Sequence, residues 1–96
     1  MNLNKTKIVA TIGPASSSRS MLSKLISSGV DVFRINFSHA SHKEVKRIVS
    51  DIKALRIEHK KHVSILGDLQ GPKIRIGNVK EGVILKKNDE IVFSTK

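Results

Sequence analysis

Three short β-type runs alternate with two stretches of helical spacing, and this alternation limits the folds open to the chain. The β-type runs are 7–12, 30–39 and 62–69. Between them, apolar residues recur every three or four positions, first from Met21 to Ile26 and then from Val45 to about Glu58. A β-α-β-α-β order with helices of ordinary length requires parallel strands joined by right-handed crossovers. The sequence therefore predicts an α/β fold.

Turn and capping residues mark where the two predicted helices begin and end. The pair Gly13-Pro14 stops the first strand, and the serines at 16–18 offer N-caps for the first helix. Gly29 is a good stop for that helix. For the second helix, Ser41 and Glu44 have the spacing of a capping box.

The second predicted strand, 30–39, has two different faces because strand side chains alternate. One face carries Phe33, Ile35 and Phe37, and the other carries Arg34, Asn36 and Ser38. A guanidinium can hold phosphate or carboxylate oxygens in a bidentate manner, and an amide and a hydroxyl can complete an anion or cation site. The alternative is an amphipathic strand with its polar side in water. Val30 and Val32 argue against this alternative, because they lie on the same face as Arg34. That face therefore begins apolar and becomes polar only at the carboxyl end of the strand, where α/β folds place their active sites.

Length and composition exclude several classes of protein. A chain of 96 residues has room for one small domain, or is a piece of a larger one. It has no cysteine, which excludes a disulfide framework and thiolate metal sites. No apolar run is long enough for a signal peptide or a membrane span. We therefore expect a soluble, cytoplasmic chain without a membrane partner.

The net charge of +10 raises nucleic acid as a possible partner. Basic residues crowd the second helical stretch, but acidic residues are interleaved with them, as is typical of a solvated helix face. These residues are Lys43, Lys46, Arg47, Lys53, Arg56, Lys60 and Lys61, with Glu44, Asp51 and Glu58. The chain has no Trp or Tyr on which bases could stack. The sequence thus argues against a nucleic-acid partner, and a basic nucleic-acid binder is the weakest of our functional alternatives.

After Gly71-Pro72 the pattern changes from alternating α and β to β alone. The β-type residues of 74–79 are followed by 83–93, which predicts two short strands around a polar turn, with no helix. A lone hairpin is at best marginally stable. We therefore expect a parallel α/β domain over 1–71 and the truncated start of a β-rich domain over 72–96.

Parallel strands bring the polar residues that follow each strand to one edge of the sheet. Those residues are Thr11 and 13–16, 34–39, and 68–73. A doubly wound sheet and a (β/α)8 barrel both place their sites at this edge. The first turn has neither the G-x-G-x-x-G nor the P-loop pattern, which argues against a common dinucleotide fold. Asp68 and Arg75 could instead have structural roles, Asp68 as a turn residue and Arg75 as an ordinary surface residue. No other histidine is spaced from His39 as a metal site would need.

Three blocks of the sequence resemble the first signature blocks of the pyruvate kinase family, in the same order and at matching spacing. The blocks are 6–16 (TKIVATIGPAS), 34–39 (RINFSH) and 68–75 (DLQGPKIR). Even the ending Leu85-Lys86-Lys87 resembles the family's small β domain. The resemblance implies the first βαβαβ portion of a (β/α)8 TIM barrel over 1–71, followed by the start of the β-barrel lid domain over 72–96.

The resemblance also implies chemistry, namely the glycolytic transfer of the phosphoryl group of phosphoenolpyruvate to ADP, giving pyruvate and ATP. In the family, the residue matching Arg34 contacts the transferring phosphoryl group, and that matching Arg75 reaches the nucleotide phosphates from the lid. The implied catalytic residues are Arg34, Lys73 and Arg75, and the implied nucleotide-binding residues are Asn36, Phe37, Ser38, His39 and Arg75. The full-length enzyme is typically a homotetramer.

Two cations follow from the resemblance. Potassium is held in the family by residues matching the side chains of Asn36, Ser38 and Asp68 and the carbonyl of Leu69. Mg²⁺ is held by residues that match nothing in this chain. Lys73 stands where most members have glutamate, and Leu69, Gln70 and Ile76 also resemble the potassium-independent branch. We therefore expect that an ammonium replaces potassium in the complete enzyme.

The resemblance further leads us to expect an amino-terminal fragment that does not turn over alone, since the family's catalytic lysine and magnesium ligands lie downstream. A free-standing anion-binding module without catalysis is the alternative. Three strands of a closed barrel leave two exposed edges. We therefore expect Phe33, Ile35 and Phe37 to be only partly covered and the fragment to self-associate.

Overall fold

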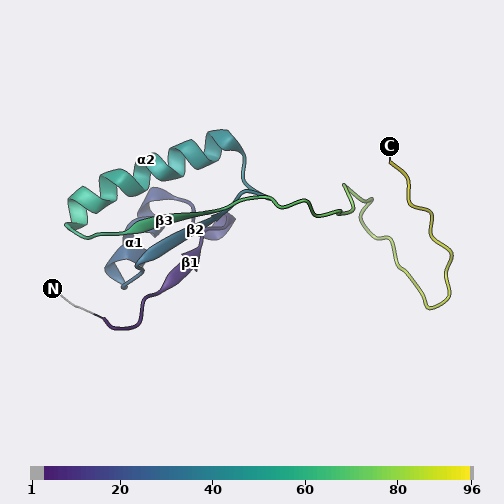
Figure 1. Ribbon diagram of the computed structural model, residues 1–96, viewed down its shortest axis with the longest axis horizontal. Helices are drawn as coiled ribbons and strands as arrows, with labels where there is room; N and C mark the ends of the chain where they lie inside the picture. Colours follow the sequence, from purple (N-terminus) through teal and green to yellow (C-terminus); the bar gives the residue numbers. More distant parts are fainter. Residues whose placement is uncertain (1–3, 96) are drawn as a thin grey trace.

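A computed structural model describes residues 4–95, which form a three-stranded parallel sheet, two α-helices and a long C-terminal segment (Figure 1). The strands are β1 (Val9–Thr11), β2 (Val32–Asn36) and β3 (Ser64–Asp68). The helices are α1 (Arg19–Ser27) and α2 (His42–His59), and a short 3-10 turn, η1 (Pro14–Ser16), follows β1. The sheet order is β1-β2-β3 and both pairs are parallel, so the predicted βαβαβ order is confirmed.

The helices begin at two of the predicted serine caps. Ser18 Oγ accepts the Met21 amide at 3.3 Å at the start of α1, and Ser41 Oγ accepts the Glu44 amide at 3.2 Å at the start of α2. These bonds satisfy amides that have no partner inside the helix. α2 runs one residue beyond the predicted Glu58, to His59, and is capped by Lys60, which takes the left-handed conformation with φ 52°.

One face of the sheet is covered by both helices and holds the core. Phe33 and Ile35 of β2 are 0% and 3% exposed. They pack with buried residues of α1 and α2, namely Leu22, Ile26, Ile48, Ile52 and Leu55. Each such side chain contributes about 1.5–3 kcal/mol relative to an exposed position. The expectation that Phe33 and Ile35 would be only partly covered is therefore wrong, because the two helices close over that face. Phe37 alone is half-buried.

The opposite face of the sheet is open. The register aligns Val9 with Val32 and Thr11 with Arg34, and paired residues of parallel strands point to the same side. Val9 is 53% exposed and Leu66, the partner of Arg34 in β3, is 44% exposed. The apolar surface that would promote self-association thus lies on this face and along the exposed segment after β3, and not around Phe33. Self-association itself stays a prediction.

The segment after β3 contains no strand within the described residues. The two strands expected within 83–93, after the β-type residues 74–79, are therefore wrong for this chain as it stands. Every described residue from 69 onward is exposed, and the segment runs away from the sheet (Figure 1). A hairpin with no sheet or helix to pack on cannot bury enough apolar area to order itself. The predicted polar turn does form, since Lys86 and Asp89 exchange hydrogen bonds of 2.8 and 3.1 Å.

The two-domain division at residue 71 remains a prediction, and its outermost residues, 1–3 and 96, lie outside the described part of the chain. In the part that is described, neither helix combines the length and the apolar composition that crossing a membrane would need.

A matched pair of isoleucines in α2 tests the position of the core. Ile52 is 0% exposed and Ile57 is 79% exposed. We expect Ile52→Val to lower the free energy of unfolding by about 0.5–1.5 kcal/mol, because it removes a buried methylene and leaves a void. Ile57→Val should change it by less than about 0.5 kcal/mol. Urea denaturation followed by circular dichroism measures both, and equal shifts would contradict the packing of α2.

Candidate functional site

Arg34 joins all three strands at the carboxyl edge of the sheet. Its Nη1 donates a hydrogen bond to Thr11 Oγ1 of β1 at 3.2 Å. Its Nη2 forms an ion pair with Asp68 Oδ2 of β3. The register explains these contacts, because Thr11 lies opposite Arg34, and Asp68 lies opposite Asn36 one pleat further along the same face. The strand order therefore brings one cation, one hydroxyl and one carboxylate together.

The guanidinium of Arg34 is accessible but already partnered. The side chains of Arg34 and Asp68 are 32% and 44% exposed, so both reach solvent on the open face. A guanidinium carries five N–H donors in a fixed fork, which leaves donors for an incoming anion. An anion that binds here accepts charge-assisted hydrogen bonds from these free donors, while the Asp68 carboxylate keeps its own contact with the guanidinium. The pair thus suits an anion whose charge exceeds that of one carboxylate, such as a phosphate.

The loop from β2 to α2 turns tightly around Asn36. Asn36 Oδ1 accepts the amide of Ser38 at 3.0 Å, and the Asn36 carbonyl accepts the amides of His39 and Ala40 at 3.2 and 3.3 Å. This arrangement is an Asx-turn, a common use of asparagine at the end of a strand. Ser38 and His39 are exposed at the edge of the sheet.

Phe37 differs from its neighbours in the predicted nucleotide-binding run. Its ring packs against the core cluster and meets the His42 ring edge-on, with 6.5 Å between ring centroids. A side chain at Gly67 would place its Cβ 3.0 Å from Phe37 Cε2, so the absence of a side chain there makes room for the ring. The Phe37 amide donates to the Asp68 carbonyl at 3.0 Å. Phe37 therefore positions the loop and turns its ring toward the helices.

A hollow of about 410 Å³ lies beside the Asn36 turn. Its walls come from the β1–α1 loop, the end of β2 and the first turns of α2. The lining residues are Thr11, Ile12, Gly13, Pro14, Ser17, Ile35, Asn36, His39, Ala40, Glu44 and Ile48. Two predicted nucleotide-binding residues, Asn36 and His39, thus share one hollow with the first loop of the chain.

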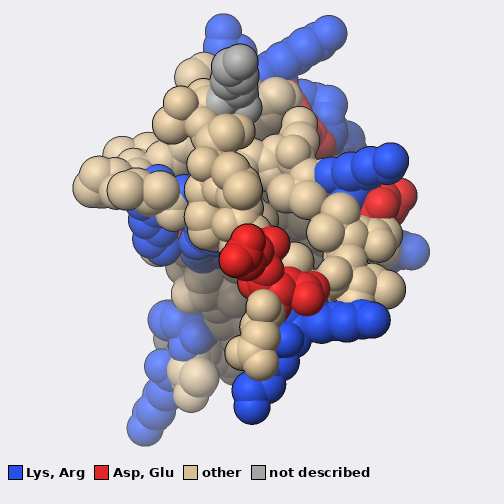
Figure 2. Space-filling view, turned by 90° about the vertical axis from the view of Figure 1, so that its right-hand side faces the viewer, with Lys and Arg blue, Asp and Glu red and all other residues tan. Residues whose placement is uncertain are grey.

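Three of the predicted site residues lie in the segment after β3. Leu69 is 75% exposed, and Lys73 and Arg75 are exposed in the segment that runs away from the sheet. Among residues 4–95, neither Lys73 nor Arg75 makes a side-chain hydrogen bond or ion pair to Arg34 or Asp68. The positive side chains at this end project around the outline and do not form one continuous patch (Figure 2). This distribution offers no basic stripe for a nucleic-acid backbone on the face shown.

The predicted cation ligands are partly occupied by protein contacts. The Asp68 carboxylate pairs with Arg34, and the Asn36 side-chain oxygen accepts the Ser38 amide. Across the described residues, no three His, Asp or Glu side chains are grouped as a metal ion would need. The oxygen donors suit a hard cation by type, but the adjacent guanidinium opposes a second positive charge.

Sequence reasoning did not assign Thr11 as a partner of Arg34, nor the ion pair between Arg34 and Asp68. The signal was present in the alternation of faces, since Thr11, Arg34 and Asp68 all fall on the face opposite Ala10, Phe33 and Gly67. Finding the contacts also required the sheet order and the register, which a single sequence does not provide.

A parallel sheet with helices on one face defines an α/β domain, and the accessible arginine at its carboxyl edge is a candidate contact for an anion. The family described as "Pyruvate kinase, barrel domain" matches residues 3–96, so the chain belongs to the pyruvate kinase family. It is 47% identical over 93 residues to each of the pyruvate kinases of Staphylococcus aureus strains USA300, COL and N315. The match covers 96% of this chain and 16% of each relative.

A double-mutant cycle tests whether the Arg34–Asp68 pair serves stability. We expect the coupling energy between Arg34→Ala and Asp68→Ala to be at most about 1 kcal/mol, because half-exposed ion pairs are screened by water. Chemical denaturation of the parent, both single variants and the double variant gives this value. The pair Arg19–Glu58, with side chains 48% and 56% exposed, is a surface comparison. A coupling energy above about 2 kcal/mol would show instead that the pair is mainly a structural clamp.

Proposed function

We propose that this chain forms the first part of the barrel in an enzyme that transfers the phosphoryl group of phosphoenolpyruvate to ADP, giving pyruvate and ATP. The observation that carries the proposal is the position of Arg34, which lies accessible at the carboxyl edge between Thr11 and Asp68. The chain spans 16% of the length of the S. aureus relatives. The activity is therefore proposed for a protein that contains this segment together with the remainder of the barrel and lid.

Each predicted site residue has a role in this proposal. Arg34 neutralises charge on the phosphoryl oxygens, because phosphoryl transfer needs positioning and positive charge more than covalent chemistry. The Asn36 turn, with Ser38 and His39, faces the nucleotide. Arg75 approaches the nucleotide phosphates from the lid. Mg²⁺ supplies further positive charge in the family, through residues outside this chain. The assembled enzyme is a homo-oligomer in the cytoplasm.

A chimera tests the proposed activity directly. Residues 1–96 replace the matching segment of the S. aureus USA300 pyruvate kinase, and pyruvate formation from phosphoenolpyruvate and ADP is measured with Mg²⁺. We expect activity from the chimera and none from residues 1–96 alone. Arg34→Lys should lower kcat by about 10²–10³, because the ammonium cannot replace the fork of donors. Arg56→Lys, the same substitution near the far end of α2, is the matched control.

The outcomes separate the two candidate functions. An active chimera with an inactive Arg34→Lys variant supports the phosphotransferase. Equal activity of the Arg34→Lys and Arg56→Lys variants would contradict the role of Arg34. An inactive chimera, together with Arg34-dependent binding of inorganic phosphate to residues 1–96, would instead favour the free-standing anion-binding module.

We also propose that the ammonium of Lys73 takes the place of potassium. An ammonium is a compact unit charge on a flexible stem and can approach phosphate oxygens much as a bound potassium ion would. Two unit charges about 4 Å apart interact by about 4 kcal/mol at an effective dielectric of 20, so a lysine near the site would oppose a second cation. Lys73 is exposed here, and its approach to Asp68 depends on the packing of the lid. Asn36, Ser38 and Asp68 then serve as hydrogen-bonding groups.

We expect the chimera to need a divalent metal but no potassium, and Lys73→Glu to create a potassium requirement. The measurement is the steady-state rate in sodium- and potassium-free buffer, with and without potassium chloride. Lys80→Glu, the same charge reversal elsewhere in the exposed segment, is the control. A parent rate that rises about tenfold or more with potassium would refute the proposal, since that change corresponds to about 1.4 kcal/mol of transition-state stabilisation.

A further inference from the structure

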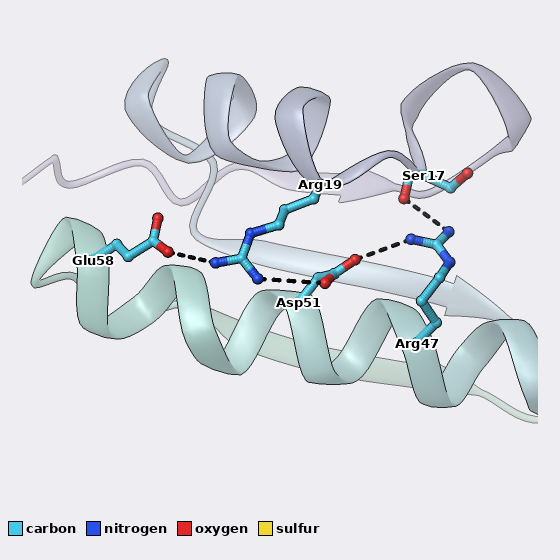
Figure 3. A network of polar contacts seen from close by, with 5 residues as sticks. All are labelled: Ser17, Arg19, Arg47, Asp51 and Glu58. Atoms are coloured by element: carbon cyan, nitrogen blue, oxygen red, sulfur yellow. Dashed lines mark hydrogen bonds and ion pairs between the residues drawn. The ribbon is translucent and has the colours of Figure 1, made fainter.

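Arg47 of α2 reaches across to the loop that follows β1 (Figure 3). Its Nη2 donates a hydrogen bond to the carbonyl oxygen of Ser17 at 3.0 Å. Its Nη1 donates to Asp51 Oδ2, one helical turn further along α2, also at 3.0 Å. The two terminal nitrogens of one guanidinium therefore bind two different partners, one on the helix and one on the loop.

Asp51 is contacted by a second arginine, Arg19, as well as by Arg47. The Asp51 side chain is 18% exposed, less than those of Arg19, Arg47 and Glu58. Its other oxygen lies 3.6 Å from Arg19 Nη1, and Arg19 also pairs with Glu58 (Figure 3). The closer contact with Asp51, one turn along the same helix, orients Arg47 toward Ser17, whereas the longer Arg19 contact links α1 to α2.

The segment that Arg47 holds is a wall of the hollow beside the Asn36 turn. Gly13, Pro14 and Ser17 line that hollow together with Asn36 and His39. Within the described residues, the loop's own bonds are local and join Gly13 to Ser16: Gly13 N–H donates to Ser16 Oγ at 2.9 Å, and the Gly13 carbonyl accepts Ser16 N–H at 3.0 Å and Ser16 Oγ at 3.3 Å. Arg47 adds the tie between the end of this loop and α2.

We propose that Arg47 is a positioning residue for the nucleotide side of the site, acting through the loop 13–17. It touches none of the residues assigned to substrate. By fixing the Ser17 carbonyl, it sets the distance between the first loop and the Asn36 turn, and so the width of the hollow that receives ADP. The nucleotide part of this inference depends on the proposed function, whereas the loop contact does not.

The same network also ties α1 to α2, which suggests a simpler structural role that must be separated from positioning. Arg19 provides that tie, through Asp51 and Glu58. Arg19→Ala removes the link between the helices and leaves the Arg47–Ser17 bond in place. Arg47→Ala removes the bond to Ser17 and leaves the Arg19 link between the helices in place. Lys46→Ala removes a neighbouring exposed charge from α2 and controls for net charge.

Amide hydrogen exchange on residues 1–96 tests the loop contact without any activity. We expect Arg47→Ala to speed exchange at the Ser16 amide about tenfold or more, as the loss of one hydrogen bond to a charged donor predicts. Exchange at the Phe37 amide, which bonds to the Asp68 carbonyl, should be unchanged. Lys46→Ala and Arg19→Ala should leave the Ser16 rate at the parent value. Equal effects of Arg19→Ala and Arg47→Ala would overturn the positioning role.

Kinetics in the active chimera test the nucleotide part. We expect Arg47→Ala to raise KM for ADP about fivefold or more, because a small displacement of a positioning loop weakens binding steeply. The kcat and the KM for phosphoenolpyruvate should stay within about twofold of the parent. Arg47→Lys, which can reach one partner but not both, should give an intermediate KM for ADP.

These measurements distinguish failure of this inference from failure of the proposed function. An inactive parent chimera contradicts the proposed function and, with it, the nucleotide part of the inference, while the exchange rates still decide the loop contact. An active chimera whose KM for ADP is the same in Arg47→Ala and Lys46→Ala overturns the inference and leaves the proposed function standing. A fall in kcat without a change in KM for ADP overturns it as well.

Discussion

The burial of Phe33 and Ile35 under two helices determines which side of the sheet can bind anything. Because side chains alternate along β2, covering these two residues forces Arg34 and Asn36 to the opposite face. A slip of one residue in the register would place the guanidinium in the core, at a cost that no nearby carboxylate could offset. Apolar packing on one face thus holds the polar chemistry of the other face in place.

The elements and the face of β2 could be predicted from the sequence, because they depend on local spacing. The capping serines and the helical periods needed no knowledge of distant residues, and the edge on which the polar residues gather followed from parallel pairing. The Arg34–Asp68 pair depends on the order and register of the strands, which arise only when the sheet forms. The prediction of strands after Gly71 was wrong because strand formation also depends on other parts of the structure. β propensity alone does not order a segment that has no surface to pack on.

Charge balance at the site depends on contacts within the chain. Asp68 offsets the charge of Arg34, and Asp51 divides its two oxygens between Arg19 and Arg47. In a chain with a net charge of +10, each carboxylate has a choice of cationic partners. The register and the i,i+4 spacing of α2 decide which partner each carboxylate takes, and therefore which guanidinium groups are oriented and which remain in solvent.

The order of the strands in the sheet is the same as their order in the chain. Each strand pairs with the one synthesised just before it, and each helix packs beside the strands it connects. Each pairing closes a loop of about 23 or 32 residues, from Val9 to Val32 and from Val32 to Ser64, and neither pairing needs a strand made later in the chain. During synthesis on the ribosome, β1, α1 and β2 can therefore assemble before β3 emerges, and the sheet grows by adding one strand at its free edge.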